Sequence, residues 1–406
     1  MTRATSPTSR LVIRLGDTRV GVLDRLPDDR IAFAFEPSYA ADPDRPTLGL
    51  GFQGTDGGLV TPRASRTALP AWFSNLLPEG HLRDYLAARA GVKPVREFFL
   101  LEALGPDLPG AVTVAAESAP SVPAQRMDET ESAVPPLRFS LAGVQLKFSA
   151  LAGADGGLTV PASGAGGDWI VKLPSARFAD VPTHETAMLD LAEAAGIEVP
   201  PHHLVPLDAI GGLPGDLGAL AGPALAVERF DRGGGGRIHI EDFAQVFHLR
   251  PGEKYGRASS EDIGRVVAAE AGFEAGMELV RRLAFAVLTG NADAHAKNWS
   301  LRYDDPRQPS LAPAYDLVGT VAFLPDTALA LSLGGARTMP EVDLGRFARF
   351  AARVGLPRAA VEEQVVATIR RLRTAWREHP AVGTLPADQR KALELHALAV
   401  PLWREG

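Results

Sequence analysis

The sequence predicts a protein of the α+β class that is built from more than one domain. Short β-strand patterns separated by turn residues fill two stretches, near residues 11–35 and 147–228. Beyond residue 240 the apolar residues recur mostly with the spacing of helices. The chain has 406 residues, which is too long for one ordinary domain, and 46% of them are hydrophobic, which is ample for a core.

The first part of the chain predicts a small α+β unit that ends near residue 115. Gly16-Asp17 and the segment 27–29 supply turn chemistry between three strands, which are expected at 11–15, 20–23 and 31–35. Three helical segments follow, at 71–77, 81–90 and 97–104. Gly91 ends the second helix, and Gly105-Pro106 ends the third.

A second part follows a stretch rich in Pro, Ser and Glu, which predicts a linker at 116–137. Strands are expected at 147–151 and 158–160, joined as a hairpin across a glycine-rich turn, and then at 169–173 and 225–228. Between them a helix is expected from about His184 to Ala195, with Thr183 as its N-cap and Gly196 directly after it. The segment 279–289 is apolar nearly all round and predicts a buried helix, and residues 342–406 predict two or three amphipathic helices.

Composition excludes several classes of protein. The net charge of −7 disfavours binding of nucleic acid by the whole surface, although a local basic patch stays open. The absence of cysteine removes disulfides, thiol nucleophiles and cysteine-ligated zinc, and is compatible with the cytoplasm. Residues 1–10 lack the apolar region of a signal peptide, and no apolar run reaches the length of a membrane span, so we expect no membrane partner.

Three polar residues carry the strongest chemical signal. Asp293 and Asn298 lie five positions apart in a loop that directly follows the apolar helix, and Asp316 follows further on within Tyr-Asp-Leu. Protein kinases use this order for catalysis: the first Asp orients the acceptor hydroxyl and takes its proton, and the Asn and second Asp hold Mg²⁺ on the nucleotide phosphates. The bland alternative is a solvated surface loop. The predicted chemistry is therefore phosphoryl transfer, with Asp293 catalytic and Asn298 and Asp316 as metal ligands.

Three basic residues are candidates for contact with phosphate. Lys172 lies inside an apolar strand, where its ammonium needs an anionic partner such as a phosphate or Glu185; the alternative is an edge-strand lysine that points to water. His295 and Lys297 lie in the same loop as Asp293. Either could contact phosphate, but we favour a bracing role for His295.

Three further segments are ambiguous when taken alone. The segment 140–147 is a small-residue loop before a strand, which could bring backbone N–H groups to phosphate or be an ordinary turn. Glu228 to Arg232 could form an adenine-binding hinge with Phe230, or a plain salt-bridged turn. The segment 237–243 is expected to open a helix with its acidic pair in the first turn.

Together these segments resemble the HipA family, the serine/threonine kinase toxins of bacterial toxin–antitoxin modules. The resemblance covers nearly the whole chain in order, and the Ala-Asp-Ala-His-Ala-Lys-Asn segment is its most specific part. The matching stretches are 73–80, 140–147, 169–174, 225–232, 241–245, 254–255, 290–300 and 313–317.

The resemblance implies a fold and its boundaries. A small N-terminal α+β subdomain (1–115) and the linker (116–137) would precede a two-lobed, protein-kinase-like fold with a mostly helical C-terminal lobe. Its N-lobe (138–230) would carry the phosphate loop and hinge, and its C-lobe (231–406) the catalytic loop.

The resemblance also implies site roles. ATP and Mg²⁺ would be used, with Asp293 catalytic, Asn298 and Asp316 on the metal, and Lys172 on the ATP phosphates. The remaining nucleotide contacts would come from the mobile phosphate loop, the hinge and the catalytic loop, and are Ala142, Gly143, Val144, Gln145, Lys147, Glu228, Phe230, His295 and Lys297. Ser140 matches the serine that family members autophosphorylate to switch themselves off.

The partners follow from the same resemblance. They would be a small helix-turn-helix antitoxin of the HipB type, operator DNA reached mainly through that antitoxin, and a host protein such as an aminoacyl-tRNA synthetase, whose phosphorylation arrests growth. Two departures exist: Ala142 replaces a second serine, so one autophosphorylation site is expected, and Ala294 replaces the usual glycine. The competing functions are a kinase with a lipid or small-molecule acceptor and a non-catalytic co-repressor that only binds the antitoxin.

Overall fold

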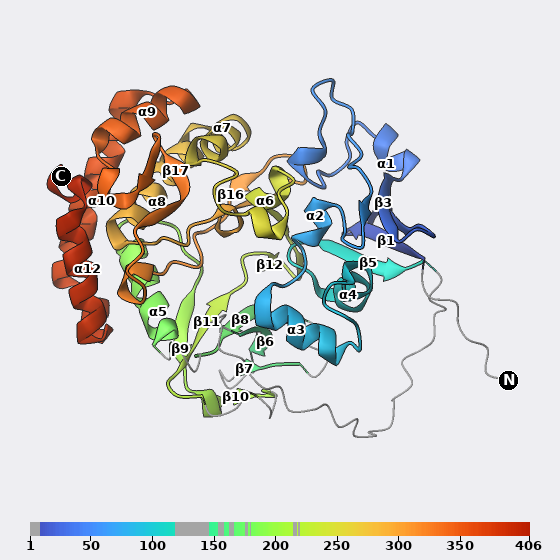
Figure 1. Cartoon of the computed structure of the whole chain (residues 1–406), viewed down its shortest axis with the longest axis horizontal. Helices are drawn as coiled ribbons and strands as arrows, with labels where there is room; N and C mark the ends of the chain where they lie inside the picture. Colours follow the sequence, from blue (N-terminus) through green and yellow to red (C-terminus); the bar gives the residue numbers. More distant parts are fainter. Residues whose placement is uncertain are drawn as a thin grey trace. The chain divides into compact units, whose positions relative to one another are not determined.

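The structure is a computed structural model of the chain, and it divides into two compact units, Met1–Val144 and Gln145–Gly406 (Figure 1). It describes residues 9–117, 146–152, 158–161, 166–174, 178, 180–213, 217 and 220–406, without the side chain at position 81. The predicted linker lies almost entirely outside the described residues, as does the predicted phosphate loop up to residue 145.

Unit 1 is built on a five-stranded antiparallel sheet in the order β4-β3-β2-β1-β5. Its strands are β1 (Arg10–Leu15), β2 (Thr18–Arg25), β3 (Arg30–Phe35), β4 (Ser65–Arg66) and β5 (Val112–Ala116). Its helices are α1 (Pro37–Ala41), α2 (Ala71–Ser74), α3 (Gly80–Arg89) and α4 (Glu97–Leu104), with 3-10 turns η1 (Leu50–Phe52) and η2 (Gly105–Asp107). The three predicted strands and three predicted helices are confirmed, although α2 ends three residues earlier than expected.

Aromatic rings fill the core of unit 1. The ring of Phe33 lies 4.7 Å from that of Phe73 and 5.9 Å from that of Phe52, and the ring of Trp72 lies 5.6 Å from that of Phe52. All four side chains are almost completely buried. Because each aromatic ring removes a large apolar area from water, this cluster gives unit 1 a hydrophobic core of its own.

Unit 2 begins with a six-stranded sheet in the order β10-β7-β6-β8-β11-β9. Its strands are β6 (Lys147–Ala152), β7 (Leu158–Thr159), β8 (Trp169–Lys172), β9 (His202–Val205), β10 (Ile210–Gly211) and β11 (Ala224–Glu228), with the turn η3 (Leu207–Ala209) before β10. Leu151 pairs with Thr159 in an antiparallel register, which confirms the predicted hairpin. Strand β8 lies between β6 and β11, so Lys172 is on an interior strand and the edge-strand alternative is wrong.

Helix α5 (Val181–Ala194) packs on this sheet. The predicted helix is confirmed, but its predicted N-cap is wrong: the N-cap is Asp180, and Thr183 lies inside the first turn. Pro182 explains the shift, because a proline is well tolerated in the first turn, where its missing N–H would have no partner in the helix. Gly196 adopts a φ of +85°, which confirms it as the left-handed residue after the helix.

Small sheets follow in unit 2. They comprise β12 (Arg232–Gly233), β13 (Gly236–Arg237), β14 (His239–Asp242), β15 (Ser300–Tyr303), β16 (Ser310–Leu311), β17 (Ala328–Leu333) and β18 (Ala336–Thr338). The prediction that 237–243 opens a helix is wrong for Glu241, which lies in β14 opposite Leu301 of β15. The helix α6 (Phe243–Val246) begins only afterwards, with Asp242 as its N-cap in a capping box with Gln245.

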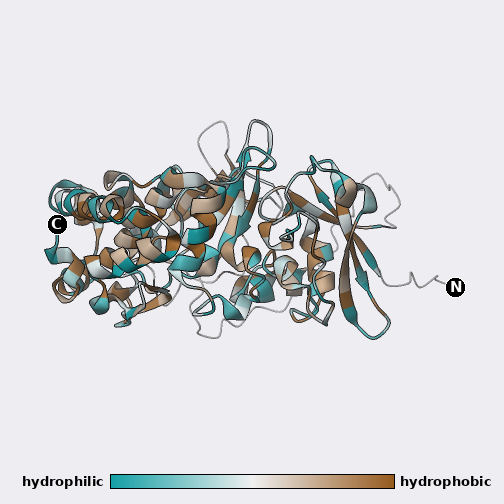
Figure 2. Cartoon of the chain, turned by 90° about the horizontal axis from the view of Figure 1, so that it is seen from above, coloured by the Kyte–Doolittle hydropathy of each residue, from teal (hydrophilic) through white to brown (hydrophobic). Residues whose placement is uncertain are grey.

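Helices make up most of the rest of unit 2. They are α7 (Ser260–Glu270), α8 (Gly272–Thr289), α9 (Leu344–Val354), α10 (Arg358–Glu378), α11 (Ala381–Thr384) and α12 (Ala387–Ala399), with 3-10 turns η4 (Pro251–Glu253), η5 (Ala296–Asn298), η6 (Thr320–Ala322), η7 (Met339–Glu341) and η8 (Pro401–Arg404). Helix α8 packs against α7, α10 and α12, which confirms the predicted buried helix (Figure 1). Hydrophilic and hydrophobic residues alternate along the helices (Figure 2), and no helix among the described residues is long and apolar enough to cross a membrane.

Candidate active site

The site is mounted on the C-terminal end of α8. Gly290 ends this helix with a φ of +73°, a left-handed conformation that favours glycine. A Cβ atom at Gly290 would lie 2.3 Å from Cγ2 of Val321, so this position also lacks room for a side chain. The sharp turn takes the chain directly from a buried helix into the polar loop 291–298.

Hydrogen bonds within the loop fix the position of Asp293. Oδ1 of the buried Asn291 accepts from the backbone N–H of Asp293 at 3.0 Å. The backbone carbonyl of Asp293 accepts from the N–H of His295 at 2.7 Å and from the side-chain amide of Asn298 at 2.9 Å. Both the N–H and the carbonyl of Asp293 are therefore held by hydrogen bonds, while the residue as a whole is exposed.

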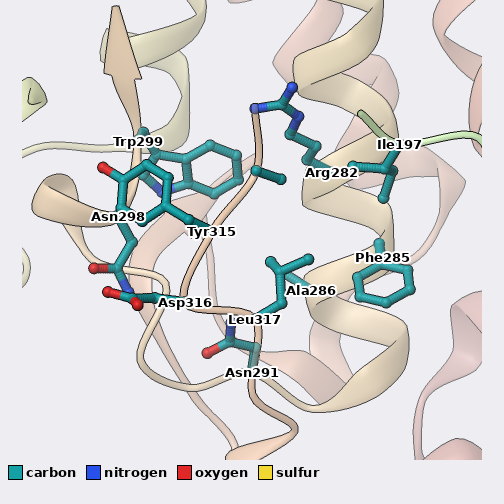
Figure 3. A pocket seen from close by; sticks show the side chains of 11 residues that line it. Ile197, Arg282, Phe285, Ala286, Asn291, Asn298, Trp299, Tyr315, Asp316 and Leu317 are labelled. Carbon is teal, nitrogen blue, oxygen red and sulfur yellow. The ribbon is translucent and has the colours of Figure 1, made fainter. Parts of the chain in front are cut away.

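Asp316 lies next to Asn298, the last residue of this loop. Both line a small cavity of ≈ 20 Å³, and their side chains lie close together with their polar ends on the same side (Figure 3). Because the Nδ2–H of Asn298 donates to the carbonyl of Asp293, its Oδ1 is the atom left to face a ligand. The pair thus offers an amide oxygen and a carboxylate.

This donor set fits a Mg²⁺ ion. Mg²⁺ is usually held by one or two carboxylate or amide oxygens, and its remaining ligands are waters and substrate phosphates. The described residues contain no group of three His, Cys, Asp or Glu side chains that could hold a metal on their own. Asn298 and Asp316 would supply two ligands, and waters or substrate phosphates would supply the rest.

Lys172 joins this site to the sheet and to α5. Its ammonium donates hydrogen bonds to the carboxylates of Glu185 and Asp316, which makes a charge cluster of these three residues. Its side chain is 9% exposed, against 2% for Glu185 and 32% for Asp316. The predicted partner Glu185 is thus in place, and the cluster ties one strand, one helix and the loop after β16 to a single point.

The charges in this cluster shift its pKa values. Burial alone would lower the pKa of Lys172, but the neighbouring charges of Asp316 and Glu185 outweigh it and raise that pKa above its usual range. Burial likewise would raise the pKa of Asp316, but the charges of Lys172 and Lys147 hold it well below its usual range. Burial raises the pKa of Glu185, and the charge of Lys172 offsets part of that rise. Asp316 is consequently ionised at neutral pH, as a metal ligand must be.

The other basic candidates lie around this cluster. Lys147 is exposed on β6, opposite Lys172 in the strand register, and its charge acts on Asp316. His295 is buried, and its ring packs edge-on against the ring of Tyr255 at 5.0 Å, which fits a bracing role. Lys297 is half-buried in η5, and its carbonyl accepts from the hydroxyl of Tyr315 at 2.8 Å.

The segment from Glu228 to Arg232 forms the salt-bridged turn that was one of its two alternatives, and adenine binding stays a prediction. Arg229 and Arg232 donate to the carboxylate of Asp231, so the segment is a salt-bridged turn. The ring of Phe230 nevertheless lies 5.4 Å from that of Tyr315, next to the candidate metal ligand, and Glu228 is exposed at the end of β11. The predicted autophosphorylation site and four loop contacts lie outside the described residues: Ser140, Ala142, Gly143, Val144 and Gln145.

Tyr255 is a site residue that reasoning from the sequence missed. Its hydroxyl donates to Oδ1 of Asp293, the atom proposed to bind the acceptor. The backbone carbonyl of Lys254 accepts from the N–H of Ala296, which fixes the segment on the loop 291–298. The motif Lys254-Tyr255 was a matching stretch, but its distance of 38 residues from Asp293 along the chain hid the contact.

Family models match both units of the chain. The model of the HipA-like C-terminal domain matches residues 139–376, and that of the HipA N-terminal domain matches residues 11–115. Among curated proteins, "Putative kinase Y4dM" of Sinorhizobium fredii is 46% identical, and the match covers 97% of this chain and 98% of that protein. The serine/threonine-protein kinase toxin HipA of Shewanella oneidensis is 26% identical, with 92% of this chain and 90% of that protein covered.

A solved structure agrees with these matches. The structure of HipA from Shewanella oneidensis MR-1, in complex with HipB and its operator DNA, superposes with a TM-score of 0.71 at 23% identity. The superposition covers 97% of this chain and 96% of that chain. The predicted fold class, an α+β protein with a kinase-like fold, is thereby confirmed.

Proposed function

The chain belongs to the HipA family, and on that premise we propose that it is an ATP- and Mg²⁺-dependent serine/threonine protein kinase. The observation that carries the proposal is the convergence of Asp293, Asn298 and Asp316 beside a buried Lys172. Phosphoryl transfer depends mainly on positioning and on neutralisation of charge, and these four residues supply both.

Each residue has a defined part in the proposed reaction. The carboxylate of Asp293 accepts the proton of the acceptor hydroxyl, whose oxygen bonds to the γ-phosphorus while the bond to ADP breaks. Asn298 and Asp316 would hold Mg²⁺, which neutralises charge on the phosphates when it is bound. Lys172 binds phosphate oxygens and keeps Asp316 ionised, and Glu185 keeps Lys172 in position.

The remaining contacts are proposed around the nucleotide. Glu228 and Phe230 would bind adenine, and Lys147, His295 and Lys297 would surround the phosphates. The loop residues Ala142 to Gln145 would cover the phosphates, and phosphorylation of Ser140 would remove that loop by adding a near-dianion beside it.

The proposed setting is a toxin–antitoxin module in the cytoplasm, where ATP is available. The solved relative is bound to HipB and operator DNA, which supports a HipB-like antitoxin as the partner of this chain and contact with operator DNA through it. The proposed substrate is a host protein, such as an aminoacyl-tRNA synthetase, whose phosphorylation would arrest growth.

Mass spectrometry of the purified protein after incubation with Mg²⁺ and ATP tests the proposal. We expect a phosphate on Ser140 in the wild type and none in Asp293→Asn. Asp304→Asn is the matched control, because Asp304 is an exposed aspartate outside the site. Equal phosphate on the wild type and on Asp293→Asn would refute the catalytic assignment, and a phosphate on the loop of Ser140→Ala would refute the modification site.

A further inference from the structure

His184 is completely buried, and it lies next to the charge cluster of Lys172, Glu185 and Asp316. The proposed mechanism gives this histidine no part. It lies on α5, one residue before Glu185, and both of its ring nitrogens have hydrogen-bond partners. Nε2 lies 3.0 Å from the backbone nitrogen of Gly319, and Nδ1 lies 2.8 Å from Oε1 of Gln389 on α12. The ring also packs edge-on against Phe323 at 4.9 Å.

These contacts fix the tautomer of His184. The backbone N–H of Gly319 is a donor, so Nε2 must accept and carries no proton. Nδ1 therefore carries the proton and donates to the side-chain oxygen of Gln389. Burial lowers the pKa of His184 to about 4, which is consistent with a neutral ring at physiological pH.

The other end of the contact is the segment that follows Asp316. Gly319 lies three residues after this carboxylate, and a Cβ atom there would lie 2.7 Å from Cδ2 of Leu393 and 2.7 Å from the carbonyl oxygen of Thr289. Its φ of −72° is ordinary, so glycine is required here by space. The segment is thus enclosed by α5, the end of α8 and the C-terminal helix α12.

We propose that His184 is a positioning residue. Gln389 orients its ring, and the ring holds the segment after Asp316 against α5; this contact is called the lock below. Since Glu185 on the same helix holds Lys172, this lock would keep the lysine and the metal-binding carboxylate in register. His184 touches no reacting atom. Helix α12 (Ala387–Ala399) lies beyond residues 139–376 matched by the C-terminal family model, so a helix outside that model would help to position the site. Its consequence for activity rests on the proposed function.

A second set of hydrogen bonds holds the same segment, so the His184 contact can be removed without unfolding the unit. The hydroxyl of Thr320 donates to the carbonyl of Gly290 at 3.1 Å and accepts from the N–H of Ala292 at 2.8 Å. These bonds tie the same segment to the catalytic loop and do not involve α5. Loss of the His184 contact should therefore loosen the segment locally while the unit stays folded.

Hydrogen exchange of residues 317–324, without nucleotide, tests the lock directly. His184→Leu removes both hydrogen bonds, and we expect exchange of this segment to become at least tenfold faster. His184→Gln keeps an acceptor oxygen for Gly319, and we expect it to restore most of the protection. Unchanged exchange in His184→Leu would overturn the proposal.

A variant on α12 tests the tautomer of His184 and leaves the histidine in place, so the test does not depend on the folding of the histidine variants. Gln389→Glu changes one atom and places a carboxylate against Nδ1, which raises the pKa of His184. The groups facing the ring from other elements are the amides of Gln389 and Gly319 and the ring of Phe323, and Glu185 on its own helix bonds Lys172. When the ring becomes charged, Nε2 gains a proton and opposes the N–H of Gly319.

The sign of the pH effect follows from this step. Exchange of residues 317–324 in Gln389→Glu should match the wild type at pH 8.5 and become at least tenfold faster at pH 5.5, after correction for the intrinsic rate. Gln364→Glu on α10 is the matched control, because Gln364 bonds the neighbouring Thr368, and it should show no such pH dependence. A Gln389→Glu variant that behaves like this control would overturn the coupling to α12.

Activity provides a separate readout. In a Mg²⁺ titration of phosphate transfer, we expect His184→Leu to raise the Mg²⁺ concentration for half-maximal rate at least fivefold, with a smaller effect on the rate at saturation. If the wild type transfers no phosphate but exchange responds as described, the proposed function fails and the positioning role stands. An equal loss of rate at all Mg²⁺ concentrations, with no change in exchange, would refute the positioning role alone.

Discussion

Replacement of Lys172 by methionine removes the positive charge that lies between Glu185 and Asp316. Methionine fills a similar volume, so the main change is electrostatic. The removal of one partner from a buried ion pair costs roughly 3–5 kcal/mol when the other charge stays unpaired. Here Glu185, whose side chain is 2% exposed, can escape this cost by taking up a proton.

The expected magnitude follows from that protonation. At pH 7, protonation of a carboxyl whose unfolded pKa is about 4.3 costs about 1.36 kcal/mol per pH unit, or roughly 3.7 kcal/mol in all. Burial already raises the pKa of Glu185 in the wild type, so part of this cost is present there. We therefore expect Lys172→Met to lower the free energy of unfolding of unit 2 by about 2–3 kcal/mol at pH 7.

The loss should depend on pH in a defined direction. With its folded pKa raised, Glu185 binds more protons in the folded state than in the unfolded state between the two pKa values. Stability must then fall as pH rises through this window, by up to about 1.36 kcal/mol per pH unit. Lys172 also holds the pKa of Asp316 down, and loss of that stabilisation is constant between pH 5 and pH 8. The difference between variant and wild type should therefore be smaller near pH 5 and largest near pH 8.

Urea unfolding, followed by tryptophan fluorescence at several pH values, measures the free energy of unfolding of variant and wild type. Four of the five tryptophans belong to unit 2, at positions 169, 299, 376 and 403. The double variant Lys172→Met with Glu185→Gln should lose most of the pH dependence, because the carboxyl that remains beside the methionine, that of Asp316, is 32% exposed and can stay ionised. Lys391→Met, at an exposed lysine of α12, controls for a general change of charge. A loss that is equal at pH 5.5 and pH 8 would refute the reasoning.

Three further predictions concern the elements around the site. Asp293→Asn should lower phosphate transfer by about 10²–10⁴-fold with little change of stability, since Asp293 is exposed; a loss below fivefold in a radiolabel assay would contradict the role of a general base. Gly290→Ala should lower the free energy of unfolding by at least about 1–2 kcal/mol, because of its positive φ and its contact with Val321; denaturant unfolding checks this, and Gly383→Ala, with open space around it, is the control. Asp242→Ala should cost about 1 kcal/mol by loss of the N-cap of α6, and an unchanged midpoint in urea would count against that cap.

The parts that could be predicted from the sequence are those with local signals. The buried end of α8 could be predicted from a run of apolar residues with a glycine after it. Strands β1 to β3 could be predicted from short β-strand patterns that are separated by turn residues. Asp293 and Asn298 lie five positions apart, so one loop contains their whole pattern. In each case the residues that determine the structure are neighbours along the chain.

The parts that were missed depend on residues far apart in the sequence. Glu241 was expected in a helix, but its strand is defined by pairing with β15, about 60 residues later, and its carboxylate accepts from the hydroxyl of Tyr303. Tyr255 reaches Asp293, and His184 reaches Gly319 and Gln389, only after the unit has folded. A single histidine on an apolar helix face gives no sign of such partners, because their positions are set by tertiary packing.

The backbone at Asp316 connects the charge cluster with the lock at Gly319. Asp316 adopts a φ of +53°, a left-handed conformation that costs most residues other than glycine about 1–2 kcal/mol. Such strain persists only where the surroundings determine the conformation. Here Lys172 holds the carboxylate, the hydroxyl of the preceding Tyr315 bonds Ser300 at 2.6 Å, and His184 holds Gly319 three residues later. Because these three contacts all act on one short segment, they orient the candidate metal ligand, and this would lower the ordering cost of binding the metal and its phosphate.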